Sequence, residues 1–248
     1  MDEAEKALKV DTVQKVGSIA RLDVSRATRR GIPEFILAEG KSDQDLLAIC
    51  KNMLEHNRRV IVTRVSDSQL TVLRENFRAP HIFEVFAHAR SVVIKQHDFV
   101  LEKTGGRVGI LTAGTVDLGV AEEAQMIANE MGCVTFLEAD AGVAGIHRLS
   151  EPLTTLIKSD VDCLIVVAGR EGALPTVVAG LVDIPLISVP TSSGYGYGGK
   201  GTAALMAMLQ ACSLGLAVVN IDSGIAAGVV ASQIANRVAK AREKRAER

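Results

Sequence analysis

Two side chains in the second half of the sequence are candidates for catalysis, Cys212 and Glu171. Cysteine is a strong nucleophile and a good leaving group, so Cys212 is a candidate for nucleophilic catalysis. Glu171 follows an apolar, strand-like run, where a carboxylate could remove a proton as a general base. Both residues also have structural interpretations. A free cysteine that ends an apolar helix is commonly buried, and the helix C-terminus disfavours a thiolate. An acid at the start of a helix is favoured by the helix dipole.

A glycine-rich loop that begins at Gly194, with the sequence GYGYGGKGT, matches two nucleotide-binding patterns. Gly194, Gly199 and Lys200 have Walker A spacing, while Gly194, Gly196 and Gly199 spell G-x-G-x-x-G. However, Gly201 follows Lys200 where a Walker A loop needs a Ser or Thr for Mg²⁺, and a dinucleotide fingerprint usually follows the first strand of its sheet. The remaining interpretation is an anion-binding loop in which backbone N–H groups and Lys200 approach a phosphate; a flexible lid is the structural alternative.

The composition limits the classes of partner. The 248 residues are 48% hydrophobic and 23% charged, with a net charge of -1 and no Trp, so we expect a globular protein that does not bind nucleic acid. No apolar run reaches the ~18 residues of a membrane span, and the charged first ten residues are unlike a secretory signal. The four cysteines form no C-x-x-C pair, which argues against a zinc knuckle or a disulfide framework. These features predict a cytoplasmic protein with reduced thiols and no membrane partner, in which Cys50, Cys133 and Cys163 are core residues.

Glycine divides the chain into two predicted domains, residues 1–104 and 105–248. Three glycines precede residue 105 and the other 19 of the 22 lie at or after it, next to the turn sequence EKTGGR. The first part predicts a smaller α/β domain, with a helix capped at its N-terminus by Ser42. The helices expected there are at 4–16, 42–57 and 66–76, and the strands are at 34–40, 59–65 and 89–96.

The second part alternates apolar strands with helices and predicts a doubly wound parallel α/β sheet covered on both faces. The expected strands are at 107–114, 133–140, 163–169, 185–190 and 216–222, and the expected helices are at 118–132, 147–159, 171–182, 202–212 and 224–248. Ligands of such sheets bind beyond the carboxyl ends of the strands. Small and polar residues gather at those ends, and we expect the site there.

The candidate binding residues all lie at these strand ends or in the glycine-rich loop. They are Thr112, Gly114, Thr115, Asp117, Asp140, His147, Arg148, Gly169, Arg170, Ser192, Ser193, Gly194, Gly196, Lys200 and Asp222. Several have alternatives that the sequence leaves open. Asp117 either caps the following helix or, with Thr115, binds ribose hydroxyls and phosphate. Asp140 caps a helix or binds Mg²⁺. His147 and Arg148 are structural or bind phosphate or carboxylate, and Asp222 could orient a ribose.

The order of these motifs resembles the aminoimidazole ribonucleotide (AIR) carboxylase family of purine synthesis. The resemblance rests on ILTAGTVDLGVAEEA, EADAGVAGIHRL, CLIVVAGREGALPTVVAGLVDIPLISVPTSSGYG and LQACSLGLAVVNIDSGIAAGVVA. Three departures from the purine enzymes are the GIHR motif, the GREGALP stretch and the cysteine in LQACS. These departures, with the added N-terminal domain, are similar to the LarB-type family of nickel-pincer nucleotide synthesis. The resemblance covers the whole chain and implies a flavodoxin-like three-layer fold and a homo-octamer.

The LarB-type resemblance also implies a reaction. Such enzymes carboxylate C5 of the pyridinium ring of nicotinic acid adenine dinucleotide with CO₂ and hydrolyse its phosphoanhydride, with Mg²⁺ expected to assist. Cys212 is then the residue that adds to the ring, and Glu171 is the base. Two alternatives remain: a mutase that acts on carboxyaminoimidazole ribonucleotide, and a regulator that binds a nucleotide without turnover.

Overall fold

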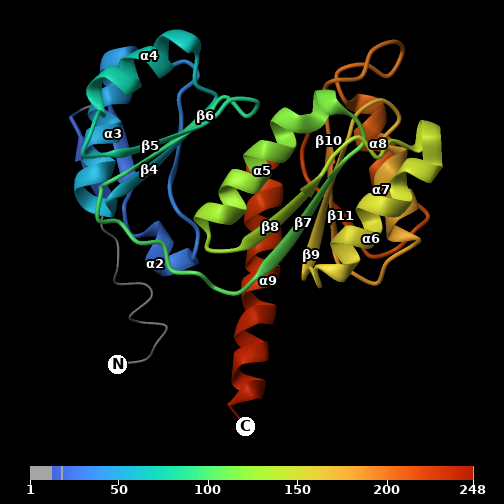
Figure 1. Ribbon diagram of the computed structural model, residues 1–248. Helices are drawn as coiled ribbons and strands as arrows, with labels where there is room; N and C mark the ends of the chain where they lie inside the picture. Colours follow the sequence, from blue (N-terminus) through green and yellow to red (C-terminus); the bar gives the residue numbers. More distant parts are fainter. Residues whose placement is uncertain (1–12, 18, 248) are drawn as a thin grey trace. The chain divides into compact units, whose positions relative to one another are not determined.

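The computed structural model describes residues 13–17 and 19–247 (Figure 1). Two compact units make up the chain, and the division falls between Val100 and Leu101. Each unit has a sheet and a hydrophobic core of its own, so each buries its apolar side chains independently.

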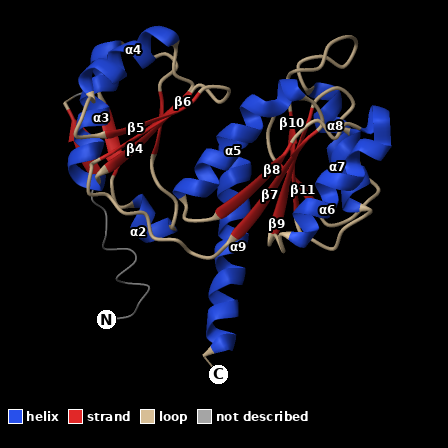
Figure 2. Ribbon diagram, viewed as in Figure 1, coloured by secondary structure: helices blue, strands red, loops and turns tan. Residues whose placement is uncertain are grey.

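The N-terminal unit combines a short antiparallel hairpin with a mixed sheet in the order β3-β4-β6-β5. Figure 2 labels three strands of this sheet, β4, β5 and β6, and the helices α2, α3 and α4 of the same unit. Its elements are β1 (Val13–Val16), β2 (Ala20–Asp23), α2 (Arg26–Arg30), β3 (Phe35–Leu37), α3 (Asp43–Asn57), β4 (Arg59–Thr63), α4 (Asp67–Asn76), β5 (Ile82–Phe86) and β6 (Ser91–Lys95). β3 and β4 are parallel, whereas β4 and β5 are both antiparallel to β6. The predicted cap of α3 is confirmed, because the Ser42 side chain accepts a hydrogen bond from the Asp45 N–H at 3.2 Å.

The first predicted helix is wrong over the part that the structure describes. Residues 13–16 form strand β1, which pairs with β2, and residues 4–12 lie outside the described residues. Two features of this segment favour the hairpin. Gly17 has a positive φ of 52°, which suits a tight turn, and Leu22 on β2 is buried in the core of this unit.

The C-terminal unit contains a five-stranded parallel sheet in the order β11-β10-β9-β7-β8, as the alternation of strands and helices predicted. Its elements are β7 (Arg107–Thr112), α5 (Leu118–Glu130), β8 (Val134–Glu138), α6 (Ser150–Lys158), β9 (Cys163–Ala168), α7 (Ala173–Ala179), β10 (Leu186–Pro190), α8 (Thr202–Leu209), β11 (Leu216–Val218) and α9 (Gly224–Ala246), with 3₁₀ turns at η1 (Thr115–Asp117) and η2 (Val143–Leu149). Every residue of β9 is buried, as a central strand covered on both faces requires.

Helices cover both faces of this sheet and produce the three layers of a flavodoxin-like fold. α5 and α9 pack on one face, and α6, α7 and α8 pack on the other (Figure 1). The α5–α9 contact is built from small residues, because a Cβ added at Gly228 would lie 2.7 Å from the carbonyl oxygen of Ala124. No helix in the described part of the chain is both long enough and apolar enough to cross a membrane.

Candidate functional site

A cavity of about 550 Å³ lies at the carboxyl edge of the C-terminal sheet, where the loops after β7, β8, β9 and β10 converge. Among the residues that line it are seven that the sequence proposed for the site: Gly114, Asp117, Arg148, Gly169, Arg170, Glu171 and Ser193. The walls between them are mainly small and apolar. This volume is in the range of small-molecule and cofactor sites, and it lies where ligands bind in doubly wound sheets.

Asp117 ties two of these loops together from a buried position, with only 3% of its surface exposed. Its Oδ1 atom accepts hydrogen bonds from the Thr191 hydroxyl at 2.6 Å and the Ser193 hydroxyl at 3.0 Å, and its Oδ2 atom accepts one from the Gly114 N–H at 3.0 Å. This carboxylate, for which the sequence left open a helix cap or a ribose contact, is therefore occupied by donors of the chain itself and makes no side-chain cap to α5. It holds the loop after β7 against the loop after β10.

Close backbone packing joins the loop after β9 to the loop after β10. A Cβ added at Gly169 would lie 2.2 Å from Ser193 Oγ, and one at Gly194 would lie 3.0 Å from the Arg170 nitrogen. Arg170 itself has a φ of 55°, a conformation that a non-glycine residue keeps only where its surroundings enforce it. Its guanidinium lies over the Tyr195 ring, 4.2 Å from the centroid. Both side chains line the cavity.

Glu171 is exposed beside this pair, between strand β9 and helix α7. Within the described part of the chain its carboxylate takes part in no hydrogen bond or ion pair, so its lone pairs are available to a substrate. A general base needs such an unengaged carboxylate within reach of the reacting atoms.

The residues after β8 form a small polar group at the rim of the cavity. Asp140 pairs with Arg148 at 3.1 Å, and its backbone N–H donates to the buried Thr112 hydroxyl at 3.2 Å. Arg148 lines the cavity, whereas Asp140 and Thr112 are not among its lining residues. His147 is exposed on the 3₁₀ turn η2, outside the cavity lining. The GIHR motif thus supplies one guanidinium to the site.

The remaining predicted residues support the glycine-rich loop or project from it. The Ser192 N–H donates to Asp222 Oδ1 at 2.8 Å, which attaches the loop to the segment between β11 and α9. Lys200 is exposed with a φ of 59°. Gly196 has a φ of 84°, which its missing Cβ permits. Thr115 is exposed at the start of η1. None of these residues is among those that line the cavity, whereas Gly194 allows the close approach to Arg170 described above.

Cys212 lies away from this cavity in the same chain. Helix α8 begins at the carboxyl edge, where Gly172 packs against Ala204, and it runs for eight residues, about 12 Å, toward the amino edge. Cys212 follows its end, and the next residue, Ser213, donates a hydrogen bond at 2.8 Å to the carbonyl oxygen of Thr176 in the middle of α7. Cys212 and Glu171 therefore lie at opposite ends of α8 and do not meet within one chain.

Cys212 is nevertheless the exposed thiol of the four. The other three are buried, as predicted. Burial raises the pKa of Cys50 and of Cys163 to about 12, and it also raises the pKa of Cys133. Since the thiolate is the nucleophile, these buried cysteines are chemically inert near neutral pH. Three apolar residues close to Cys212 in the sequence are exposed. Met206 is 62% exposed, Leu209 66% and Leu214 88%.

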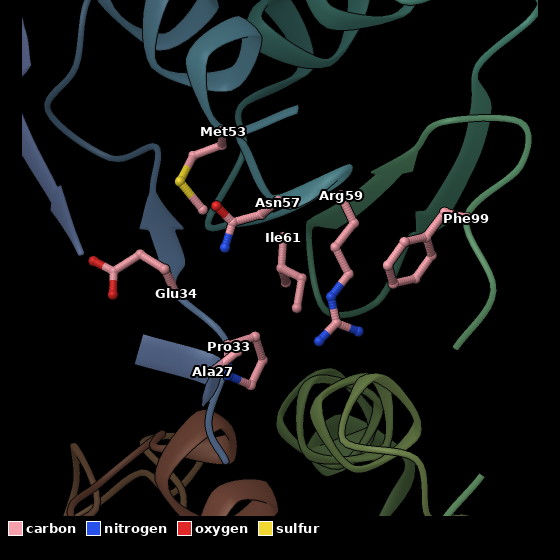
Figure 3. Close-up of a pocket in the computed structure, with 8 residues that line it drawn as sticks. All are labelled: Ala27, Pro33, Glu34, Met53, Asn57, Arg59, Ile61 and Phe99. Atoms are coloured by element: carbon pink, nitrogen blue, oxygen red, sulfur yellow. The ribbon is translucent and has the colours of Figure 1, made fainter. Parts of the chain in front are cut away.

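A smaller cavity of about 150 Å³ lies wholly within the N-terminal unit (Figure 3). Its lining is mainly apolar and includes Met53 and Ile61, and the Arg59 guanidinium lies 5.3 Å from the centroid of the Phe99 ring. A cavity of that size accommodates a single ring. It is much smaller than the cavity of the C-terminal unit.

The described residues include no group of three His, Cys, Asp or Glu side chains that could hold a metal ion. Asp117 and Asp140, the two candidate carboxylates after β7 and β8, already accept hydrogen bonds from the chain. A dedicated Mg²⁺ cage therefore does not fit the described side chains, although Mg²⁺ commonly binds through substrate phosphates with one or two carboxylates.

Both units match known protein families. Residues 13–96 match the LarB/PurE-like N-terminal domain, and residues 107–248 match AIR carboxylase. The chain belongs to the AIR carboxylase family and has the LarB domain order. An uncharacterized protein of Methanocaldococcus jannaschii is 40% identical over 239 residues, which cover 95% of this chain and 91% of the relative. The N5-carboxyaminoimidazole ribonucleotide mutase of the same organism is 34% identical over 127 residues, covering 50% of this chain and 76% of the mutase.

These matches support an enzyme of the carboxylase or mutase type. They agree with a cavity that combines an unengaged carboxylate, Glu171, with two guanidinium groups, Arg148 and Arg170. One lining residue, Tyr195, was not among the predicted site residues. Its position inside the glycine-rich loop was the signal that could have found it, because a large aromatic residue between glycines has no role in an anion-binding backbone.

Proposed function

We propose that the protein carboxylates the pyridinium ring of nicotinic acid adenine dinucleotide at C5 and hydrolyses its phosphoanhydride. The products are AMP and pyridinium-3,5-biscarboxylic acid mononucleotide. The observation that carries this proposal is the combination of an exposed thiol, Cys212, with an unengaged carboxylate, Glu171, in a chain that has the LarB domain order. The purine reaction of this family has no need of a nucleophilic thiol.

The proposed reaction explains why both groups are present. The Cys212 thiolate adds to C4 of the cationic ring, and the ring becomes a neutral enamine whose C5 carbon attacks CO₂. The new carboxylate and a proton then share C5, and Glu171 removes that proton. The nitrogen lone pair finally expels the thiolate from C4, which restores the aromatic pyridinium. In the hydrolytic step, water attacks one phosphorus of the phosphoanhydride and AMP leaves.

Because Cys212 and Glu171 lie at opposite ends of α8, the proposal requires that a second copy of the chain supply the thiol. The exposed apolar side chains Met206, Leu209 and Leu214 support such an assembly, since apolar surface next to a functional group marks an interface. An octamer, as the family resemblance implies, would bring copies together in this way. The site is then composite, with Glu171 from one subunit and Cys212 from another.

The decisive experiment is mass spectrometry of the reaction of the full-length protein with nicotinic acid adenine dinucleotide, bicarbonate and Mg²⁺. We expect AMP and the biscarboxylated mononucleotide from the wild type and from Cys50→Ala, which removes a buried thiol of the N-terminal unit. Cys212→Ala should give no carboxylated product, and Glu171→Gln should accumulate a ring adduct on Cys212 in the intact-protein mass spectrum. No product from the wild type would reject the proposal, and carboxylation by Cys212→Ala would reject the thiol mechanism.

Mixed assemblies test the composite site. Cys212→Ala and Glu171→Gln should each be inactive alone, but random co-assembly should restore roughly a quarter of the sites, because each composite site draws its two groups from different subunits. Mixtures that stay inactive after subunit exchange, with exchange verified by native mass spectrometry, would contradict a site shared between copies.

A second candidate is mutase activity on N5-carboxyaminoimidazole ribonucleotide, which the 34% identity to that mutase over half of this chain favours. The same preparation incubated with carboxyaminoimidazole ribonucleotide separates the two candidates. Turnover of this compound that persists in Cys212→Ala would favour the mutase.

A further inference from the structure

We propose that Tyr195 is a further substrate-binding residue, whose ring stacks on a planar cationic heterocycle in the carboxyl-edge cavity. The inference rests on the proposed function for the identity of that heterocycle, a pyridinium. The anion-binding interpretation of the glycine-rich loop gives Tyr195 no role.

The Arg170 guanidinium already occupies one face of the Tyr195 ring. Tyr195 lines the cavity with 78% of its surface exposed, and the Arg170 guanidinium lies over the ring at 4.2 Å from the centroid. A guanidinium is a planar, delocalised cation, and the negative face of an aromatic ring attracts cations of that shape. The structure therefore displays a cation-binding face that is satisfied by a side chain of the chain itself.

The second observation is that the backbone before Tyr195 is held from two sides. The Ser193 hydroxyl donates to the buried Asp117 carboxylate at 3.0 Å, and Gly194 packs so closely on Arg170 that a Cβ there would lie 3.0 Å from the Arg170 nitrogen. The backbone thus carries the ring to the cavity wall at a defined place. Tyr197, two residues later, is fully exposed and lines no part of this cavity.

A pyridinium ring shares the properties that make the guanidinium a good partner, because it is flat, positively charged and weakly hydrated. It can replace the Arg170 guanidinium on the ring face, whereas the neutral adenine of AMP offers no such charge. When the thiolate adds to C4, the ring loses its positive charge. Tyr195 therefore acts on the binding of the substrate, so its loss raises KM without lowering kcat.

Intrinsic fluorescence gives a direct test, because the chain has two tyrosines and no tryptophan, and both tyrosines lie in this loop. In the full-length Tyr197→Phe protein, Tyr195 is the sole tyrosine emitter. Nicotinic acid mononucleotide should quench its emission saturably, because a stacked electron-poor ring accepts an electron from the excited phenol. AMP at matched absorbance, and free tyrosine amide as a reference for inner-filter effects, should give no saturable component.

The kinetic test compares matched variants of the loop. Tyr195→Leu should raise KM for nicotinic acid adenine dinucleotide by roughly fivefold to thirtyfold with kcat maintained, Tyr195→Phe should remain near the wild type, and Tyr197→Leu should be unchanged. An unchanged KM in Tyr195→Leu, or equal quenching by AMP and the pyridinium nucleotide, would overturn the inference. Absence of turnover by the wild type would instead refute the proposed function, and the quenching titration would still decide whether Tyr195 receives a pyridinium.

Discussion

The buried carboxylate of Asp117 gives the most direct test of how the site is held together. Three donors converge on it: the Thr191 and Ser193 hydroxyls and the Gly114 N–H, at 2.6, 3.0 and 3.0 Å. We predict that Asp117→Ala destabilises the C-terminal unit substantially, and that Asp117→Asn does so much less.

The expected size follows from the number and kind of these bonds. A hydrogen bond to a charged group contributes about 1.5–3 kcal/mol, and a buried donor left without a partner costs about 1–3 kcal/mol. Water can reach the Gly114 and Ser193 side of the group, so we expect a total loss of about 3 kcal/mol for Asp117→Ala rather than the full sum. In Asp117→Asn the amide keeps one acceptor oxygen, and the two hydroxyls can rotate to accept its N–H groups. Its cost should be about 1 kcal/mol.

Urea unfolding followed by tyrosine emission measures the free energy of unfolding of the C-terminal unit, because both tyrosines of the chain, Tyr195 and Tyr197, belong to that unit. Asp183→Ala, which removes an exposed loop carboxylate of the same unit, is the matched control and should leave the midpoint nearly unchanged. A double-mutant cycle with Thr191→Val should give a coupling free energy of about 1–2 kcal/mol.

Two outcomes would refute this reasoning. The first is an Asp117→Ala protein within about 0.5 kcal/mol of the wild type, because that would mean that water replaces the carboxylate at little cost. The second is a coupling free energy near zero with Thr191→Val, because the shortest of the three bonds would then contribute nothing specific.

Three further predictions follow from burial and backbone geometry. Ellman's reagent should modify one of the four thiols rapidly in the native protein, and this fast phase should vanish in Cys212→Ala; a second fast thiol would contradict the burial of the others. Because burial raises the pKa of Cys50 to about 12, the unfolded chain loses that proton first as the pH rises, so stability falls between about pH 8.5 and 12. Between pH 8 and 10 the wild type should therefore lose roughly 2 kcal/mol more than Cys50→Ala in urea unfolding, and parallel losses would show that Cys50 is not responsible. Gly172→Ala should cost about 2–3 kcal/mol, because φ is +65° and a Cβ would lie 2.8 Å from the Ala204 carbonyl oxygen; Gly215→Ala, with φ +94° and open space around it, should cost only about 1 kcal/mol, and equal costs would remove the steric part of the explanation.

The fold of the C-terminal unit was predictable because each of its strands is an apolar run next to a helical pattern. The N-terminal unit was less predictable, for two physical reasons. The segment Val13–Val16 has a short, mixed pattern whose strand state depends on its partner Ala20–Asp23, which lies across a turn. Strand β5 is an edge strand with no fully buried residue, so Ile82–Phe86 lacks the strong apolar signal of a central strand.

The location of the cavity at the carboxyl edge was also predictable, since parallel strands bring their carboxyl ends to one edge. The separation of Cys212 from Glu171 was available from the same topology. A helix that follows a parallel strand runs back to the amino edge, so a residue at the end of α8 must lie opposite the loops that begin it. What the sequence could not give is the pairing of Arg170 with Tyr195, which depends on the close packing of two loops.

The contacts of the polar residues at the carboxyl edge separate those that build the site from those that can bind a ligand. Sequence patterns cannot make this distinction, because a carboxylate that accepts backbone N–H groups and one that binds a ribose are the same residue type in the same place. Here the N–H groups of Gly114 and Ser192, two natural donors for a phosphate, already donate to Asp117 and Asp222. A phosphate in this cavity must therefore rely more on cationic side chains than on these amides.

Arg148 lines the cavity and Lys200 lies in the exposed glycine-rich loop, so we expect these two residues to contribute more to nucleotide affinity than the loop after β7. Alanine substitutions at Arg148 and Lys200 should accordingly weaken AMP binding, measured calorimetrically, more than Thr115→Ala does. The reverse order would mean that the amides at the start of η1 hold the phosphate.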